Sequence, residues 1–136
     1  GHGKNKAAMA LLLETAAAET QLGKYPDNYP SNGHGICQID KIAFDDINIR
    51  TRARHRNRIA FYFGVSLDHI TIKDIQEIPL YAFIFARLHY ILRPEEIPST
   101  LEERAHYWKQ YYNTEAGKGT TQHYIKSALT HLYTEE

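Results

Sequence analysis

The sequence predicts a single all-α domain over residues 1–136. The chain opens with a segment of strong helix formers, glycine and proline divide the rest into helix-length pieces, and no segment alternates polar and apolar residues as a strand does. A length of 136 residues and a hydrophobic content of 43% suit one compact domain with its own core. We expect roughly five to seven helices, with residues 1–5 disordered or a remnant of cloning.

The first helix is expected over residues 6–22, which are rich in Ala, Leu and Glu. Gly23 follows at the position of a C-terminal cap. Because the segment is nearly all apolar, most of its sides should be buried. A polar loop over residues 24–35, rich in Pro, Asn, Asp and Gly, then leads to a short apolar segment at 36–39.

The middle of the chain predicts two further helices. The first is expected over residues 44–63, across an Arg-rich centre, and ends before Gly64. A short, partly helical connector follows, with Ser66 or Thr71 as its N-cap. Pro79 then begins a strongly apolar helix through residue 92, because proline is tolerated in the first turn, where its missing N–H has no helical partner.

Two more helices complete the chain. Ser99 or Thr100, followed by two glutamates, predicts a helix that ends near Tyr112. After a loop, Thr120 or Thr121 caps a last helix that ends a few residues before the C-terminus.

Composition excludes several classes of protein. The formal charge is zero, so nothing in the overall balance indicates a nucleic-acid-binding protein. No apolar run is long enough for a membrane span. The single cysteine, Cys37, cannot form an internal disulfide, and we expect a small buried apolar residue rather than a nucleophile paired with His34. The eight histidines show no zinc-binding spacing, so we expect no metal site. We also expect no cofactor and a monomeric protein.

Two glutamates of the first helix are candidates for chemistry. Glu14 and Glu19 lie about 140° apart around a helix, so they cannot both face one cleft. Glu19 lies on the last turn, next to the polar loop, whereas Glu14 lies deeper among Leu and Ala. A half-buried carboxyl has a raised pKa and keeps the proton that a general acid needs. The alternative is that Glu19 is an ordinary solvated residue at a helix end.

Two motifs resemble those of goose-type lysozymes and the related lytic transglycosylases. Residues 19–23 (Glu-Thr-Gln-Leu-Gly) are similar to the Glu-Ser-x-x-Gly that ends a buried helix in that family, and residues 35–41 (Gly-Ile-Cys-Gln-Ile-Asp-Lys) are similar to its Gly-Leu-Met-Gln segment with a following Asp-Lys. The helix over 81–92 resembles the family's core helix. Residues 112–117 are similar to its Tyr-Asn-Ala-Gly motif, with two extra residues before Ala-Gly. The resemblance spans roughly residues 8–130 and is strongest in the first third.

The resemblance implies a lysozyme-like helical domain with an active-site cleft beside a buried central helix. Glu19 would protonate the β-1,4 glycosidic oxygen between N-acetylmuramic acid and N-acetylglucosamine. The family tyrosine corresponds to Tyr112 or Tyr111, and Tyr112 is preferred because it directly precedes Asn113. The substrate-binding residues implied are Gly35, Ile36, Gln38, Tyr112 and Asn113.

Asp40 matches an aspartate that positions the attacking water in goose-type enzymes, and Asp27 is a candidate for a second such carboxylate. An inverting glycosidase needs this second carboxylate, so Asp40 favours hydrolysis over the transglycosylase reaction, in which a sugar hydroxyl attacks. Asp27 has an alternative interpretation as an ordinary turn residue after Pro26.

Other interpretations remain beside the muramidase. Chitinase-like phage endolysins have a His-Glu-Thr-Gly helix end, to which Ala-Glu-Thr here is similar, but they usually carry a longer insert, with another Glu, before the glutamine. A peptidoglycan-binding module without activity and a non-enzymatic helical interaction protein are the remaining two. If the chain is a muramidase, its partner is peptidoglycan in the periplasm or outside the cell, as for a phage endolysin or a tail-associated lysozyme. We then expect an export route that this sequence does not encode.

A basic run has arginine at every second position from Arg50 to Arg58. Spacing by two distributes these residues around a helix rather than along one face. A solvated helix surface is the favoured interpretation, ahead of attraction to an anionic cell wall or lipopolysaccharide, and nucleic-acid binding is the least favoured.

Overall fold

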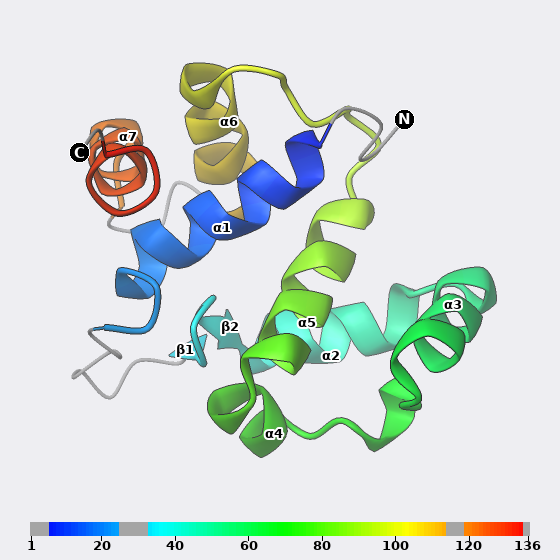
Figure 1. Ribbon diagram of the computed structural model, residues 1–136. Coiled ribbons are helices and arrows are strands. Elements are labelled where there is room, and N and C mark those ends of the chain that lie inside the picture. The colour runs from blue at the N-terminus through cyan, green and yellow to red at the C-terminus, as the bar shows by residue number, and fades with distance from the viewer. Residues whose placement is uncertain (1–5, 25–32, 114–118, 135–136) are drawn as a thin grey trace.

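The computed structural model describes residues 6–24, 33–113 and 119–134, which are mostly helical, and this confirms the all-α class (Figure 1). The expectation for residues 1–5 lies outside this part of the chain. The elements are α1 (Ala7–Thr20), β1 (Gly33–His34), β2 (Ile39–Asp40), α2 (Lys41–Arg50), α3 (Ala53–Phe63), the 3-10 turn η1 (Leu67–His69), α4 (Ile72–Glu77), α5 (Pro79–Ile91), α6 (Leu101–Trp108), the π-helical turn η2 (Lys109–Asn113) and α7 (Thr121–His131). In the described ranges, none of these helices has the length and apolar character needed to span a membrane.

The predicted helix over residues 44–63 is wrong, because two helices occupy this region. Asp40 caps α2, which therefore begins at Lys41, and the chain becomes extended at Thr51 before α3 starts. Arg56 on α3 donates to the carbonyl oxygens of Asn48 and Thr51, so one guanidinium holds the end of α2 against the start of α3. A contact between side chain and backbone across a helix break leaves no periodic signal in the sequence.

Most predicted caps are present. The side chain of Thr71 forms a capping box with Asp74 at the start of α4, and Thr100 and Thr120 accept backbone N–H groups at the starts of α6 and α7. Pro79 occupies the first turn of α5. The prediction that Gly23 caps the first helix is wrong, because α1 ends at Thr20 and its C-cap is Gln21.

The end of α1 is an unusual left-handed segment. Gln21 is the C-cap, and Gln21, Leu22 and Gly23 all have positive φ, at 52°, 61° and 83°. The N–H of Leu22 donates to the carbonyl oxygen of Ala16, six residues back, so the left-handed segment folds back onto the end of α1. Non-glycine residues rarely adopt this conformation, which is why the sequence indicated the glycine as the cap.

A two-residue hairpin follows, which the sequence did not predict. Strands β1 and β2 pair antiparallel, with Gly33 opposite Asp40 and His34 opposite Ile39. Strands of this length are too short to show a period of two. Gly35 lies in the turn with φ 75°, and a side chain there would collide with the carbonyl group of Ile75. The hairpin is therefore held close to the end of α4.

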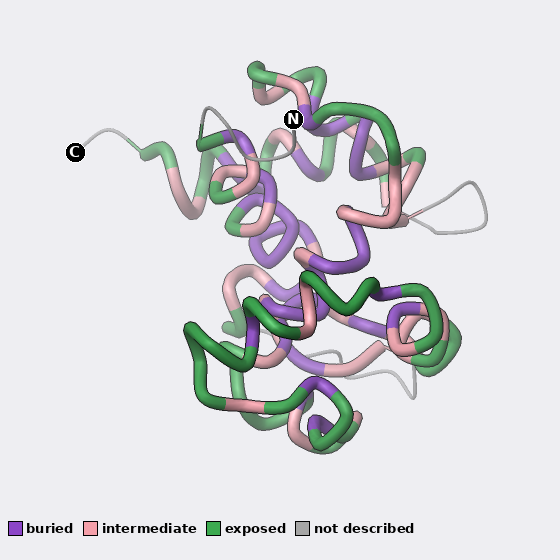
Figure 2. The backbone as a smooth tube through the Cα atoms, turned by 90° about the vertical axis from the view of Figure 1, so that its right-hand side faces the viewer, coloured by how far each residue is buried: buried purple, intermediate pink, exposed green. Residues whose placement is uncertain are grey.

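The core consists of two hydrophobic clusters. One includes Ile47 and Phe85 and lies between the hairpin, α2, α4 and α5. The other includes Trp108 and Tyr124 and lies between α1, α6 and α7. Tyr112 packs against both clusters. Figure 1 shows α1, α6 and α7 as an upper group and α2 to α5 as a lower group, and Figure 2 shows the exposed turns on the outside of both.

A buried ion pair joins the upper helices. Glu14 on α1 has no exposed surface, and its carboxylate receives two hydrogen bonds from the Arg104 guanidinium at 2.7 and 2.8 Å. The hydroxyl groups of Tyr124 and Tyr133 donate to the same carboxylate at 2.9 and 2.5 Å. The charge of Glu14 is therefore fully compensated inside the protein, as a buried carboxylate requires.

Candidate active site

Two carboxylates of α1 lie in different environments. Glu14 is fully buried in the ion pair with Arg104, which gives it a structural role. Glu19 is half-buried and lies one residue before the end of the helix. It is close to the hairpin, because the adjacent Thr20 donates to the carbonyl oxygen of Ile36, and its charge adds to the burial that raises the pKa of Cys37. Glu19 is thus the carboxylate of α1 at the point where the helix meets the hairpin.

The hydroxyl of Thr20 joins the two sequence motifs. It donates to the carbonyl oxygen of Ile36 at 2.7 Å and accepts from the backbone N–H of Gly23 at 2.9 Å. Thr20 is only 2% exposed, and both of these bonds are partly buried. The Glu-Thr-x-x-Gly spacing therefore has a physical function: it closes the left-handed turn after Glu19 and attaches this turn to the hairpin.

The hairpin turn is held by amide groups. The side-chain amide of Gln38 donates to the carbonyl oxygen of Gly35 at 3.0 Å, and Gln38 itself has a φ of 54°. The N–H of Gly35 donates to the side-chain oxygen of Gln76, which follows Ile75 in α4. Strained conformations of this kind occur where the surrounding structure fixes them, and they concentrate at functional sites.

The hydroxyl of Tyr112 also bonds to the hairpin. It donates to the carbonyl oxygen of Cys37 at 2.5 Å. Its ring stacks on Tyr90, with centroids 5.0 Å apart, and His89 packs edge-on against it at 5.1 Å. The neighbouring Tyr111 packs instead on the second core cluster, so Tyr112 is the tyrosine whose hydroxyl bonds to the hairpin.

Glu19 and Asp40 influence the pKa values of groups beside the hairpin. Desolvation raises the pKa of Tyr112 well above its usual value, and the nearby carboxylates of Glu19 and Asp40 are among the groups that raise it further. Burial, followed by the charge of Glu19, raises the pKa of Cys37. Cys37 is fully buried, as expected for a small apolar residue, and the raised pKa keeps its thiol protonated.

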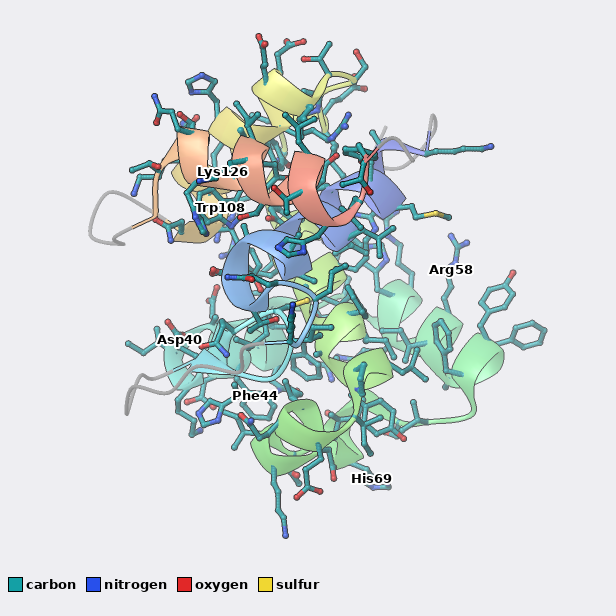
Figure 3. The ribbon with its side chains drawn as sticks, turned by 60° about the vertical axis from the view of Figure 1, so that its left-hand side comes forward. Asp40, Phe44, Arg58, His69, Trp108 and Lys126 are labelled. Carbon is teal, nitrogen blue, oxygen red and sulfur yellow. The ribbon has the colours of Figure 1, made fainter. Side chains whose placement is uncertain are left out.

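Asp40 has an identified structural role. One of its carboxylate oxygens accepts from the backbone N–H of Ala43 at 2.7 Å, which caps α2. Figure 3 shows Asp40 and Phe44 on one side of the lower group, whereas Arg58 lies at the other side on α3. The geometry accounts for an aspartate at this position without catalysis, and the same carboxylate contributes to the electrostatic environment of Tyr112.

The structure gives less information about the other residues predicted for the site, Asn113 and Asp27. The side-chain oxygen of Asn113 accepts from Lys109 at 2.8 Å within η2, and both side chains are half-buried. Asp27 lies outside the described residues, as do residues 115–117 of the Tyr-Asn-Ala-Gly resemblance. No three His, Cys, Asp or Glu side chains of the described ranges could together bind a metal ion.

Three residues that support this arrangement were not predicted. Gln76 fixes the hairpin turn, His89 packs against Tyr112, and Arg104 compensates Glu14. Gln76 and Arg104 lie 41 and 90 residues from their partners in the sequence, so no local pattern indicates them. His89 belongs to an apolar helix that was correctly predicted, and a histidine among apolar residues could have been noted as a buried group.

Comparisons with models of protein families, with curated proteins and with solved structures gave no match.

A cavity of about 800 Å³ lies elsewhere on the molecule. It is lined mostly by residues of α3 and α5, and none of the residues predicted for the active site lines it.

Proposed function

We propose that the chain is a peptidoglycan-degrading glycosidase of the lysozyme type, with Glu19 as its general acid. The observation that carries the proposal is the convergence of the separate sequence motifs. Thr20 bonds to Ile36, Tyr112 bonds to Cys37, and Glu19 influences the pKa of both Cys37 and Tyr112. A half-buried carboxyl group can serve as a general acid, and Asp40 offers the second carboxylate that an inverting glycosidase uses.

In the proposed reaction, Glu19 donates its proton to the glycosidic oxygen between N-acetylmuramic acid and N-acetylglucosamine. The bond from the sugar C1 to that oxygen breaks, and a water molecule attacks C1 from the opposite face. Asp40 takes a proton from this water as it attacks, and attack from the opposite face inverts the configuration at C1. The proposal places the glycan strand along Gly35, Ile36, Gln38 and the η2 turn, beside helix α1.

The capping role of Asp40 favours a second candidate, a lytic transglycosylase. If Asp40 serves only to begin α2, no carboxylate activates water, and the 6-hydroxyl of the muramic acid residue attacks C1 instead. The product then has an anhydro ring and is lighter by one water molecule.

The test of the proposal is clearing of purified peptidoglycan by Glu19→Gln. We expect a loss of at least about a hundredfold, which is the typical contribution of general acid catalysis. The matched control is Glu102→Gln, which removes an exposed carboxylate from α6 and should clear like the wild type. Equal clearing by Glu19→Gln and the wild type would reject Glu19 as the acid. Binding without clearing by the wild type would instead indicate an inactive wall-binding module.

Asp40→Asn separates the two reactions. Asparagine caps a helix about as well as aspartate, so α2 should keep its start while the carboxylate is lost. Hydrolysis predicts a large loss of activity in this variant and reducing ends in the muropeptides of the wild type. Unchanged activity, with anhydro products in the mass spectrum, would establish the transglycosylase.

A further inference from the structure

The face formed by α3 and α5 has a cavity that the proposed glycosidase does not use. Its volume of about 800 Å³ lies within the range of roughly 300–1,000 Å³ found for ligand sites. Apolar side chains of α5, among them Ile84, Leu88 and Ile91, form much of its wall. A smaller, more polar cavity of about 450 Å³ shares Arg54, Leu88 and Ile91 with it, so the hollow continues toward the end of α5.

The same cavity carries a concentration of positive charge. Arg54 and Arg58 of α3 and Arg87 of α5 contribute to its lining, and none of the described lining residues is acidic. The ion pairs found in the described ranges do not include Arg54 or Arg58. Partial burial, followed by the charges of neighbouring arginines, lowers the pKa of His55, which also lines the cavity. The site therefore has a positive electrostatic potential.

An aromatic tip completes this face. Phe61, Tyr62 and Phe63 are the last three residues of α3, and they are 81%, 66% and 50% exposed. The rings of Phe61 and Tyr62 contact each other edge-on, with centroids 5.1 Å apart. Phe63 also lines the cavity, so the aromatic tip and the cavity form one surface. Exposed apolar groups that adjoin one another in this way mark interaction sites.

We propose that this face binds an anionic phospholipid bilayer, with a lipid phosphate between Arg54 and Arg58, an acyl chain in the cavity and the aromatic tip in the interface. The combination of groups supports this partner. A nucleic acid would match the arginines, but it has no apolar segment for a cavity lined by Ile and Leu. Aromatic side chains with flanking cations are typical of proteins that lie on membrane surfaces. The proposal does not rest on the glycosidase activity.

The experiment is sedimentation of the protein with vesicles of phosphatidylcholine alone, and with vesicles that also contain about 30% phosphatidylglycerol. We expect binding to the anionic vesicles only, weakening as salt is added. Arg58→Gln should lower the partition coefficient about fivefold, since each cation near an anionic surface contributes on this scale. Phe61→Ser should lower it about tenfold, because a large apolar ring no longer enters the interface.

Two control variants match these substitutions elsewhere on the surface. Lys126→Gln removes an exposed cation from α7, which Figure 3 shows far from Arg58. Ile42→Ser removes an apolar side chain from the start of α2 that is 82% exposed, close to the 81% of Phe61. Both controls should bind anionic vesicles like the wild type, and equal losses in the controls and the α3 variants would overturn the proposal.

A soluble ligand tests the cavity itself. Calorimetry should detect binding of a short-chain phosphatidylglycerol below its micelle concentration, and no comparable binding of glycerol phosphate, which has the phosphate without the chain. Equal affinity for both would remove the acyl chain from the proposal. Binding to neither kind of vesicle, or tighter binding to a single-stranded DNA oligonucleotide than to anionic vesicles, would overturn the membrane surface as the partner.

Discussion

Thr20 connects two segments of the candidate site through one hydroxyl group. The hydroxyl donates to the carbonyl of Ile36 and accepts from the N–H of Gly23, so it holds the helix end and the hairpin together. Because Glu19 is the preceding residue, the position of its carboxyl depends on this connection.

Thr20→Val tests that dependence, since valine has nearly the same shape and no hydroxyl. We expect a loss of about 0.5–1.5 kcal/mol in the free energy of unfolding, because two partly buried hydrogen bonds to the backbone are lost. Clearing of peptidoglycan should also fall. Thr20→Ser is the matched control, which keeps the hydroxyl and should retain most of both properties. Urea denaturation and the clearing assay measure the two effects, and a fully active, fully stable valine variant would contradict the connection.

The motif at this end of the chain could be predicted from the sequence, whereas its partners could not. Glu19, Thr20 and Gly23 lie within five residues, so their spacing is visible as a pattern. The partner of the hairpin turn, Gln76, lies 41 residues away from Gly35, and only the tertiary fold brings them together. The π-helical turn that orients Tyr112 also has no sequence signal that distinguishes it from an α-helical turn.

At the scale of the elements, the buried carboxylate of Glu14 fixes α1 to its neighbouring helices. Glu14 receives hydrogen bonds from Arg104 of α6 and from Tyr124 of α7, so one buried carboxylate fixes α1 relative to both neighbouring helices. The pKa of Arg104 is raised, mainly by its hydrogen bond to Glu14, which agrees with a strong pair. The helix could be predicted from its composition, but the ion pair depends on residues far along the chain.

Glu14→Gln should lower the free energy of unfolding by about 3–5 kcal/mol, because the guanidinium of Arg104 is left buried without its counter-charge. The double variant Glu14→Gln with Arg104→Met should recover part of this loss, since it removes both charges. Thermal or urea unfolding measures the change. A loss in the double variant equal to the sum of the losses in Glu14→Gln and in Arg104→Met alone would show that the two groups are not coupled. This stability effect also distinguishes Glu14 from Glu19, whose replacement by glutamine should affect clearing and leave unfolding nearly unchanged.

At the scale of the whole molecule, the candidate site lies where the two core clusters meet. Tyr112 packs against both clusters, and His89 of α5 lies against its ring. Burial, followed by the charge of Arg93, lowers the pKa of His89 to about 4, while Asp40 and Asp46 oppose this shift. The junction of the two groups therefore contains a histidine that stays neutral in the folded protein.

This histidine predicts acid destabilisation of the whole domain. The unfolded chain binds a proton at His89 below a pH of about 6.5, whereas the folded protein does so only near 4. The stabilisation is therefore complete above about pH 6.5 and is lost as the pH falls toward 4, by up to roughly 3 kcal/mol. His89→Phe should flatten this part of the stability curve. The same substitution at the exposed His106 of α6 should leave the curve unchanged, and an unchanged curve in His89→Phe would contradict the assignment.

The burial of Cys37 has a practical consequence. The chain has one thiol, and that thiol is sealed beneath a turn whose carbonyl is bonded to Tyr112. A thiol reagent can reach it only when the hairpin moves away from its neighbours, so the labelling rate reports how often this local opening occurs. Labelling should be slow in the native protein and faster in Tyr112→Phe. When the reagent reacts faster than the opened hairpin closes again, the labelling rate should no longer depend on the reagent concentration. Cys37 is thus a built-in probe of how often this junction opens.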